Sequence, residues 1–518
     1  MLAPNTPIII GVGEIREKEI DVDHSTEPSG MMLKAIRQAA QDAGLSEAAL
    51  RSADSLSVVP PWTWAYPDLP GTLATDLQMQ PSSFKALGHH GGEQCAMLTD
   101  EAARRIASGE SKLAIVTGGE ALASLAASQK AGKPHPAGWS APDPAAQAVS
   151  TNNLEFNGKN MASRHGMGLA IHVYPMYENG LRARVGQTQQ ENRDESAELY
   201  AAFDRTACAH PASWRAGETP RDAAAVGTVT AKNRMICTPY PLLQNAFNTV
   251  NLSAAVILTS VGHAQALGIA PSQWVYVLGG AGTNDRDSWW ERSNFYSSQS
   301  LEQAIDATIG VSGIGSRDAI DAFDFYSCFP VVPKLACRHL GLSITRPHKP
   351  ITLLGGLTSF GGAGNNYSMH AIVAMARAIR AKTFRTGFVL ANGGVLSHHY
   401  GLVLSRAPRS SGIAVYPRSN PLPHDMAVPS APELDEAATG PAVIETYTIA
   451  YGRKGDPEIA HIVARVEATG HRFLANNGDA ATLQYMADLD VEPIGTRGVV
   501  RQTEDGRNAF FISTPAKL

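Results

Sequence analysis

Runs of apolar residues alternate with helix-spaced apolar residues along the first 120 positions. Short apolar runs at Pro7–Gly13, Ser55–Val59 and Leu113–Thr117 are typical of buried strands. Between the second and third runs, Glu93–Ser108 repeats apolar residues at intervals of four and ends at Gly109, as an amphipathic helix would. The alternation predicts a parallel sheet with helices on its faces.

The second half repeats this plan after a less regular stretch, residues 121–245, which we interpret as an insertion lying over the sheet. Ser300–Gln303 is a capping-box pattern and predicts a helix that starts there and continues through Ile309. The other predicted elements are strands at Ser253–Thr259, Trp274–Leu278, Ala322–Tyr326, Gly387–Asn392 and Tyr400–Leu404, and helices at Asn192–His210, Pro330–Leu340 and Ser368–Arg380. Two similar halves indicate an internal duplication.

The C-terminal region has a different pattern. Residues 406–440 are rich in Pro, Ser and Ala and are interpreted as a linker. Short strand patterns then follow one another with turn residues between them, which favours a small β-barrel, possibly of OB type. We therefore expect a first half over 1–260 that includes the insertion, a second half over 261–405, the linker, and a β-rich domain over 441–518.

Composition narrows the class of protein. The chain has 43 Lys+Arg against 48 Asp+Glu, a net charge of −5, which argues against a dedicated nucleic-acid binder. No apolar run approaches the roughly 18 residues that a membrane span needs, and the N-terminus shows no secretory pattern. The five cysteines are scattered, unlike a disulfide framework. We expect a cytoplasmic protein with reduced thiols and no membrane partner.

Two common kinds of cofactor site are disfavoured. Gly279–Gly282 follows a predicted strand, but the third glycine of a dinucleotide fingerprint is missing, so we interpret it as a turn at the end of the strand and expect no nicotinamide cofactor. The histidine pairs at 89–90 and 398–399 consist of adjacent residues, which point to opposite faces of a strand, and neither HExxH nor CxxC occurs. We expect no metal.

Other residues could carry chemistry. The small-residue loop 355–366 opens a predicted helix, so its backbone N–H groups, those of Gly361 and Gly362 among them, could approach an anion or a developing oxyanion. Cys95 lies near a helix start and is either a nucleophile or a small buried residue. Tyr326 could act as an acid or base if a neighbour lowers its pKa.

Several strings together resemble the thiolase superfamily, and most closely its thiolase-like protein type 1 group, which is related to the sterol-carrier-protein thiolases. The resemblance covers roughly residues 5–405, and residues after 440 resemble the additional C-terminal domain of that group. It implies two tandem thiolase halves, an inserted loop domain, and binding of acyl-CoA. The strings that carry it are Gly91–Cys95, Ala114–Glu120, Tyr174–Asn179, Asp324–Phe329, Gly355–Asn366 with His370, and Asn392–His399.

The sequence departs from that family at its reactive positions. Where thiolases carry a cysteine nucleophile this chain has Gly92, and where they carry the Asn or His of the NEAF/HDCF string it has Tyr326. The family's GHP histidine corresponds to Gly362, and its second cysteine to Ala391. Losing thiolate and base together removes the covalent route. Cys95, three residues past the family position, would substitute only if the loop register were shifted.

Thiolase-like steroid aldolases offer a second comparison. They also lack the cysteines, and they resemble this chain in carrying a tyrosine at the position of Tyr326, where it is thought to serve retro-aldol cleavage. They carry a second tyrosine where this chain has Gly362. They work with a separate OB-type partner that binds acyl-CoA, whereas here a barrel-like segment is fused to the chain.

These inferences lead to two hypotheses. The first is an acyl-CoA-dependent enzyme that makes or breaks a C–C bond in a β-keto or β-hydroxy substrate, by retro-Claisen or retro-aldol chemistry. The second is a CoA or acyl-CoA binding protein without turnover. Either could be a monomer or a homodimer. We expect Tyr326, His399 and His370 to move protons, and Cys95 is the alternative nucleophile. The residues expected to bind the substrate or an oxyanion are Gly92, Gly361, Gly362, Asn365, Asn392 and Gly393.

Overall fold

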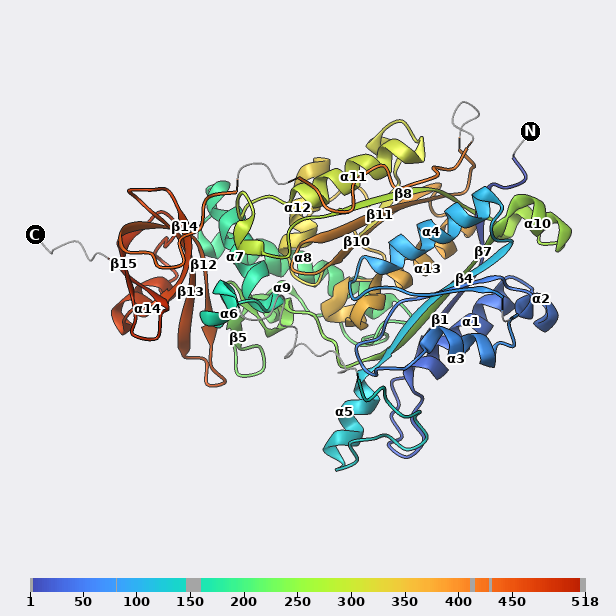
Figure 1. Cartoon of the computed structure of the whole chain (residues 1–518), viewed down its shortest axis with the longest axis horizontal. Coiled ribbons are helices and arrows are strands. Elements are labelled where there is room, and N and C mark those ends of the chain that lie inside the picture. The colour runs from blue at the N-terminus through green and yellow to red at the C-terminus, as the bar shows by residue number, and fades with distance from the viewer. Residues whose placement is uncertain (1–2, 81, 146–159, 410–414, 428–430, 513–518) are drawn as a thin grey trace, which may run out of the picture.

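An α/β core and a small barrel lie at opposite ends of an elongated molecule (Figure 1). The computed structural model describes residues 3–80, 82–145, 160–409, 415–427 and 431–512. Parts of the expected linker and the last residues of the expected C-terminal domain fall outside these ranges. No helix in the described ranges combines the length and the apolar character that crossing a bilayer requires.

The core contains one nine-stranded sheet in which the two halves meet edge to edge. The join is short, since β1 and β8 pair only at Ile8 with Tyr276 and Ile9 with Val275. The strands follow the order β3 (Phe84–Leu87), β2 (Ser55–Val58), β4 (Leu113–Ala121), β7 (Asn251–Ser260), β1 (Pro7–Arg16), β8 (Val275–Asn284), β11 (His398–Ser405), β10 (Thr386–Gly393) and β9 (Ala322–Phe325).

The sheet is mixed, which corrects the expectation of a parallel one. β2 pairs in parallel with β3 and β4, and β9 pairs in parallel with β10. β1, expected to be a parallel strand, is antiparallel to both β7 and β8. Apolar runs identify burial on both faces but carry no information about strand direction, which the connections decide.

Two buried helices fill the space between the halves. α4 (Gln94–Ser108) contacts strands of both halves, and α13 (Tyr367–Arg380) does the same. α1 (Pro28–Asp42) covers the outer side of the first half, and α11 (Gln299–Ser312) and α12 (Val331–Leu340) cover the second. Because α4 and α13 are covered on both sides, their starts lie deep in the molecule.

Two local expectations in the second half are wrong. The glycines 279–282 do not form a turn, since β8 continues through them to Asn284. Glycine is needed there because a Cβ on Gly282 would lie 2.2 Å from the ring of Tyr400. The following helix begins at Gln299, one residue before Ser300, and Ser298 rather than Ser300 caps it by accepting a hydrogen bond from the Leu301 N–H.

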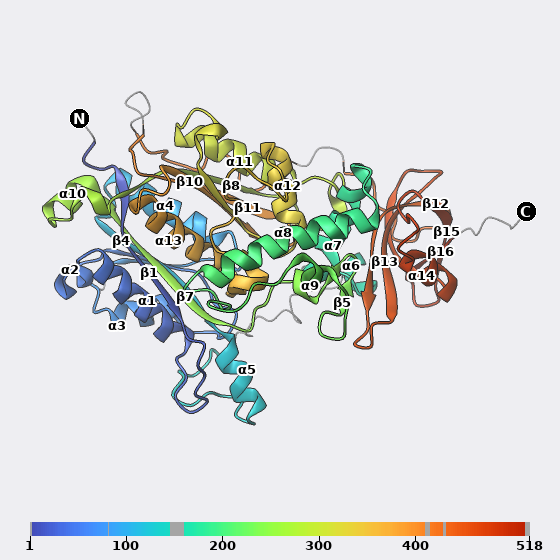
Figure 2. The ribbon, with the colours of Figure 1, turned by 180° about the vertical axis from the view of Figure 1, so that it is seen from behind.

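The insertion between the halves is mainly helical. Its longest helix, α8, runs from Gln189 to Ala209 and starts at a capping box formed by Thr188 and Glu191. α7 (Ala170–Arg184) lies between the core and the barrel (Figure 2).

Other short helices of the described chain, within and outside the insertion, are α2 (Glu47–Arg51), α3 (Leu69–Asp76), α5 (Leu122–Lys130), α6 (Met161–Arg164), α9 (Ala223–Gly227) and α10 (Val261–Ala266).

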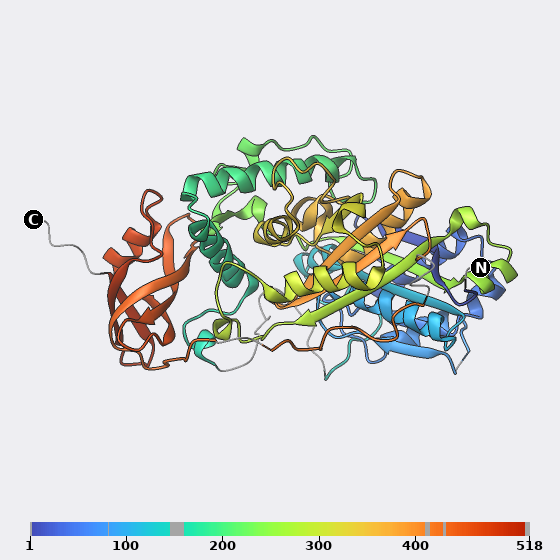
Figure 3. The same ribbon diagram turned by 90° about the horizontal axis from the view of Figure 1, so that it is seen from above.

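The C-terminal strands close into a five-stranded barrel, which Figure 3 shows at the far end from the N-terminus. The barrel contains β12 (Gly440–Tyr451), β13 (Pro457–Val466), β14 (Arg472–Asn477), β16 (Asn508–Ile512) and β15 (Arg497–Gln502), with α14 (Ala480–Ala487) between β14 and β15. The expected small barrel is therefore present. Two short strands of the insertion, β5 (Met235–Cys237) and β6 (Tyr240–Pro241), extend the sheet beyond β12.

Candidate active site

A cavity of about 480 Å³ lies where the two halves and the insertion meet. The core contributes the loop before α4 and the segments that follow β2, β9 and β10. The insertion contributes the start of α7, residues next to β5, and the segment 242–249. The described lining is mainly apolar, and Arg234 is its one permanently charged side chain. An apolar cavity with a few polar groups is typical of a small-molecule site.

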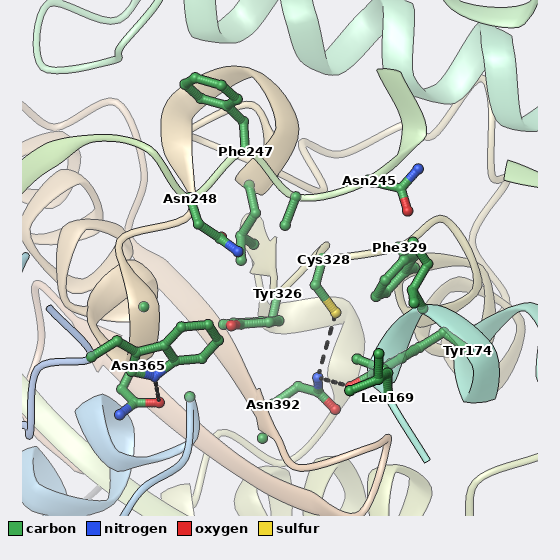
Figure 4. Close-up of a pocket in the computed structure, with 18 of the residues that line it drawn as sticks. Leu169, Tyr174, Asn245, Phe247, Asn248, Tyr326, Cys328, Phe329, Asn365 and Asn392 are labelled. Atoms are coloured by element: carbon green, nitrogen blue, oxygen red, sulfur yellow. Dashed lines mark hydrogen bonds between the residues drawn. The ribbon is translucent and has the colours of Figure 1, made fainter. Parts of the chain in front are cut away.

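Polar side chains gather in one part of this cavity. Tyr326 and Cys328, just after β9, point into the same space as Asn392 at the end of β10 (Figure 4). The Asn392 amide nitrogen donates to the Tyr174 hydroxyl at 2.9 Å and contacts the Cys328 sulfur at 3.8 Å. Its buried Oδ1 has no partner in the described part of the chain. This cluster can therefore offer a ligand the Tyr326 hydroxyl, while the Asn392 Oδ1 is buried in the wall.

Burial keeps the phenol and the thiol of this cluster protonated. It raises the pKa of Tyr326 well above the usual value, and it raises the pKa of Cys328 to about 12. A neutral phenol donates a hydrogen bond, whereas a protonated thiol is a poor nucleophile. The condition set for Tyr326 to act as a base, a neighbour that lowers its pKa, is thus not met, and the neutral phenol can donate a hydrogen bond.

Gly92 lies directly beside Tyr326. A Cβ at Gly92 would be 2.3 Å from the Asn392 carbonyl oxygen and 2.9 Å from the Tyr326 hydroxyl. Real side chains do not approach backbone so closely, so no larger residue fits without a shift of the backbone. The space that a nucleophile at this position would need is occupied, and the missing side chain is a steric requirement of this site.

The two glycine loops differ in what their amides can do. The N–H of Gly92 makes no hydrogen bond to the backbone of the residues that the structure describes. The N–H of Gly362, by contrast, donates to the Phe247 carbonyl oxygen at 2.8 Å. Gly361 and Gly362 do not line the cavity, whereas Gly364 and Asn365 of the same loop do. The expectation that Gly361 and Gly362 hold an oxyanion therefore does not fit this geometry.

His370 lies in the core and not at the cavity. Its side chain is fully buried, and its Nδ1 is 2.7 Å from the Glu14 carboxylate. Burial alone would raise the pKa of Glu14, but the hydrogen bond and charge of His370, with the charges of His210 and of Arg377 at 2.6 Å, bring that pKa below its usual value. His370 thus stabilises the contact between α13 and β1, which differs from the proton-transfer role expected of it.

His399 is also enclosed. Its Nδ1 lies 3.0 Å from the Ser300 hydroxyl of α11, and the residue is not part of the cavity wall. Burial lowers the pKa of His399 well below the usual value, so the ring is neutral. A neutral ring that does not reach the cavity is not placed to move a substrate proton.

Cys95 is packed behind the wall. It is fully buried, it does not line the cavity, and its thiol contacts the Asn365 carbonyl oxygen at 3.2 Å. Burial raises the pKa of this thiol, which disfavours the thiolate. Of the two alternatives for Cys95, the geometry favours a small buried residue over a relocated nucleophile.

Sequence reasoning missed several residues of the cavity. His90 was weighed only as a metal ligand, yet its ring stacks on Trp62 at 5.3 Å between centroids, and both line the cavity. Arg234 and Phe247 come from the insertion, whose irregular sequence gave no signal for them. The described residues include no cluster of three or more His, Cys, Asp or Glu side chains that could hold a metal ion.

The C-terminal end of the chain matches a known protein family. Residues 421–505 match the family described as "Thiolase-like protein type 1 additional C-terminal domain". No curated protein sequence matches the chain significantly.

Solved structures extend the likeness to the whole chain. The crystal structure of a monomeric SCP2-thiolase-like protein type 1 from Mycobacterium smegmatis is 29% identical, with a TM-score of 0.80 over 99% of this chain and 100% of that one. The Ltp2-ChsH2(DUF35) aldolase has a TM-score of 0.56 at 17% identity, covering 78% of this chain and 98% of that chain. Human mitochondrial 3-ketoacyl-CoA thiolase in complex with CoA has a TM-score of 0.55 at 11% identity, covering 78% and 99%. The chain has the thiolase fold, and its resemblance to thiolase-like protein type 1 is confirmed.

Proposed function

We propose that this chain, a thiolase-fold protein similar to thiolase-like protein type 1, binds an acyl-CoA and makes or breaks a C–C bond beside the thioester carbonyl without a covalent acyl-enzyme. The observation that carries the proposal is the pairing of Gly92 with Tyr326. The first leaves no room for a nucleophile, and the second places a neutral phenol in the cavity. Proton transfer and hydrogen bonding are the chemistry that this pair can supply.

Cleavage of a β-hydroxyacyl thioester fits these groups better than thiolysis, because it needs no enzyme-bound thioester. The Cα–Cβ bond breaks to release a carbonyl compound, and its electron pair passes to Cα with negative charge developing on the thioester oxygen. Because Tyr326 is a neutral phenol, it would take the proton of the β-hydroxyl in the same event in which its own proton moves to Cα, so that no separate base is needed and the phenol is restored. The Gly92 N–H would donate to the enolate oxygen. An aldolase among the proteins of similar fold supports this direction.

The cavity suits the two ends of such a substrate. Its apolar walls would hold the acyl chain, and Arg234, the permanent cation of the described lining, would contact a phosphate of CoA. Two thiolases of similar fold are known in complex with CoA.

We also propose that the barrel is of OB type, because its strands follow the order β12-β13-β14-β16-β15 and return to β12. The five buried free cysteines support a reducing, cytoplasmic location.

Incubation with thioesters tests the proposal. The full chain would be mixed separately with 3-hydroxyhexanoyl-CoA and with acetoacetyl-CoA plus free CoA, and the products identified by mass spectrometry. We expect acetyl-CoA and butanal from the first compound. Tyr326→Phe should lower the rate by roughly 100-fold or more, and Tyr296→Phe, at a residue 39% exposed and away from the cavity, should not change it. An unchanged rate in Tyr326→Phe would remove the phenol from the mechanism.

A binding protein without turnover is the second candidate. It is favoured by the protonated state of the buried thiols and by the burial of His370 and His399 away from the cavity. Hexanoyl-CoA binding measured by calorimetry, together with no product from either reactive thioester, would support this candidate over the enzyme. A covalent acyl adduct on Cys95 or Cys328 would contradict both candidates.

A further inference from the structure

The Asn365 side chain is held in one orientation by Trp62. The Trp62 indole nitrogen lies 2.8 Å from Asn365 Oδ1, and an indole N–H can only donate. That amide atom must therefore be the oxygen. The other end agrees, since Nδ2 donates to the Pro60 carbonyl oxygen at 2.9 Å. The orientation of this amide thus follows from two contacts with fixed donor and acceptor roles.

This orientation decides where the proton of His90 lies. Asn365 Nδ2 is 3.3 Å from His90 Nδ1, and an amide nitrogen carries only hydrogens. His90 Nδ1 must accept, so the neutral ring carries its proton on Nε2. Stacking on Trp62, with 28° between the ring planes, fixes the plane of the imidazole. Within the described chain Nε2 has no partner, and His90 lines the cavity.

We propose that His90 is a further catalytic residue, which donates its Nε2–H to the carbonyl oxygen of the bound acyl thioester as negative charge develops there. This inference rests on the proposed function. His90 is two residues before Gly92, whose backbone lies beside the Tyr326 hydroxyl, and all three residues line the same cavity. Trp62 and Asn365 are positioning residues for this donor, because they act through His90.

The surroundings keep the ring neutral. Burial lowers the pKa of His90, and the neighbouring His89 lowers it further, whereas the Glu93 carboxylate opposes them. The other groups in direct contact with the ring, Trp62 and Asn365, carry no charge. Protonation would in addition place an Nδ1–H against the amide hydrogens of Asn365. A neutral donor of this kind keeps its hydrogen-bonding role across neutral pH.

The tautomer can be measured without any turnover. In the full chain with ¹⁵N-labelled histidine, NMR should show His90 with Nε2 protonated and Nδ1 unprotonated, and the ring should titrate below the ordinary pKa. Trp62→Phe keeps an aromatic ring and removes the indole donor, so the amide can turn and the two tautomers should mix. Asn365→Asp should move the proton to Nδ1 and raise the pKa. A wild-type ring protonated on Nδ1 would overturn the inference.

A bound thioester then tests the catalytic role. Addition of hexanoyl-CoA should shift the His90 Nε2 resonance in the wild type. His90→Gln should lower the cleavage of 3-hydroxyhexanoyl-CoA by roughly 100- to 1,000-fold, as loss of an oxyanion donor does. His24→Gln is the control and should retain the rate, since the His24 side chain is 82% exposed and does not line the cavity.

The outcomes separate the two proposals. If hexanoyl-CoA binds without moving the Nε2 resonance, or if His90→Gln cleaves at the wild-type rate, the role of His90 is wrong while the proposed function stands. If no thioester binds the folded wild-type chain, the proposed function fails and the role of His90 fails with it.

Discussion

The glycine pairs at 91–92 and 361–362 each precede a buried helix, yet the structure uses them differently. Gly91 and Gly92 line the cavity, and the Gly92 N–H makes no hydrogen bond to the backbone in the described part of the molecule. Gly361 and Gly362 face the insertion, and the Gly362 N–H already donates to Phe247. Tyr326 lies next to Gly92, whereas next to the second pair Phe360 contacts the ring of His370, which is paired with Glu14. The first loop is open to the cavity, and the second is closed by contacts within the chain.

The difference shows what makes a small-residue loop functional. A glycine permits close approach, but what approaches it can be a ligand or another part of the chain. At Gly362 the segment 242–249 of the insertion takes the place that a ligand would need. Substitutions near Gly92 should therefore affect the rate of cleavage, whereas substitutions near Gly362 should affect the free energy of unfolding.

The largest effect is expected at Gly92. Gly92→Cys restores the residue type of the thiolase nucleophile, but its Cβ would collide with backbone at Asn392 and with Tyr326. We expect cleavage to fall by roughly 100-fold or more and the free energy of unfolding to fall by about 1–3 kcal/mol. Rate measurement, denaturant unfolding and mass spectrometry of the intact chain would check this. A gain of thiolysis with an acyl adduct would show that the site still accommodates the covalent route.

His370→Gln should act on stability alone. It leaves the Glu14 carboxylate buried with Arg377 as its remaining charged contact, which should cost about 1–3 kcal/mol of unfolding free energy. The rate per folded molecule should stay at the wild-type value. A large loss of rate without loss of stability would return His370 to the catalytic set.

The pairing of His370 with Glu14 should also make the free energy of unfolding depend on pH. The pKa of Glu14 is lower in the folded chain than in the unfolded one, so its contribution is present above the usual value of 4.5 and is lost as pH falls below it, through the folded pKa. Glu14→Gln should abolish this part of the acid dependence of stability. Glu17→Gln, at a surface ion pair with Lys34, is the control and should leave it nearly intact. Chemical unfolding between pH 3 and 7, a range set by that usual value, measures the difference.

Arg234→Ala should weaken ligand binding in the cavity beside Gly91 and Gly92 and change little else. Removing a charge-assisted contact to phosphate should weaken hexanoyl-CoA by about 10-fold. The effect should shrink as salt is raised, because screening already weakens the wild-type contact. Calorimetry at two salt concentrations would check both statements, and equal affinity of the two proteins would exclude Arg234 from the phosphate site.

Gly362→Ala should have the smallest effect. The added Cβ would lie 2.3 Å from Asn248 Oδ1, the mobile end of a side chain, and the backbone φ of −84° suits alanine. We expect a change of about 1 kcal/mol or less in the free energy of unfolding and an unchanged rate. A loss of rate comparable to that of Gly92→Cys would erase the distinction between the two loops.

The sequence predicted best those elements that depend on residues close together in the chain. The helices α4 and α13 were predicted within a few residues, and the barrel was predicted as a run of short strands, because apolar spacing and turn residues act over short distances. The antiparallel placing of β1 and the passage of β8 through its glycines depend on partners far along the chain. Among the site residues, Tyr326, Gly92, Asn365, Asn392 and Gly393 line the cavity, whereas the histidines at 370 and 399 do not.

The sequence by itself determined the duplicated α/β plan and the added barrel, since both follow from residue type and spacing, and its resemblance to thiolases showed that Gly92 stands where they carry the reactive cysteine. Only the tertiary structure decided which polar groups meet at the cavity. A histidine or a glycine amide is a candidate by its chemistry, but its role depends on whether its hydrogen-bonding capacity is already used by a neighbour. That neighbour can be Glu14 for His370 or Phe247 for Gly362, residues more than a hundred positions away in the chain.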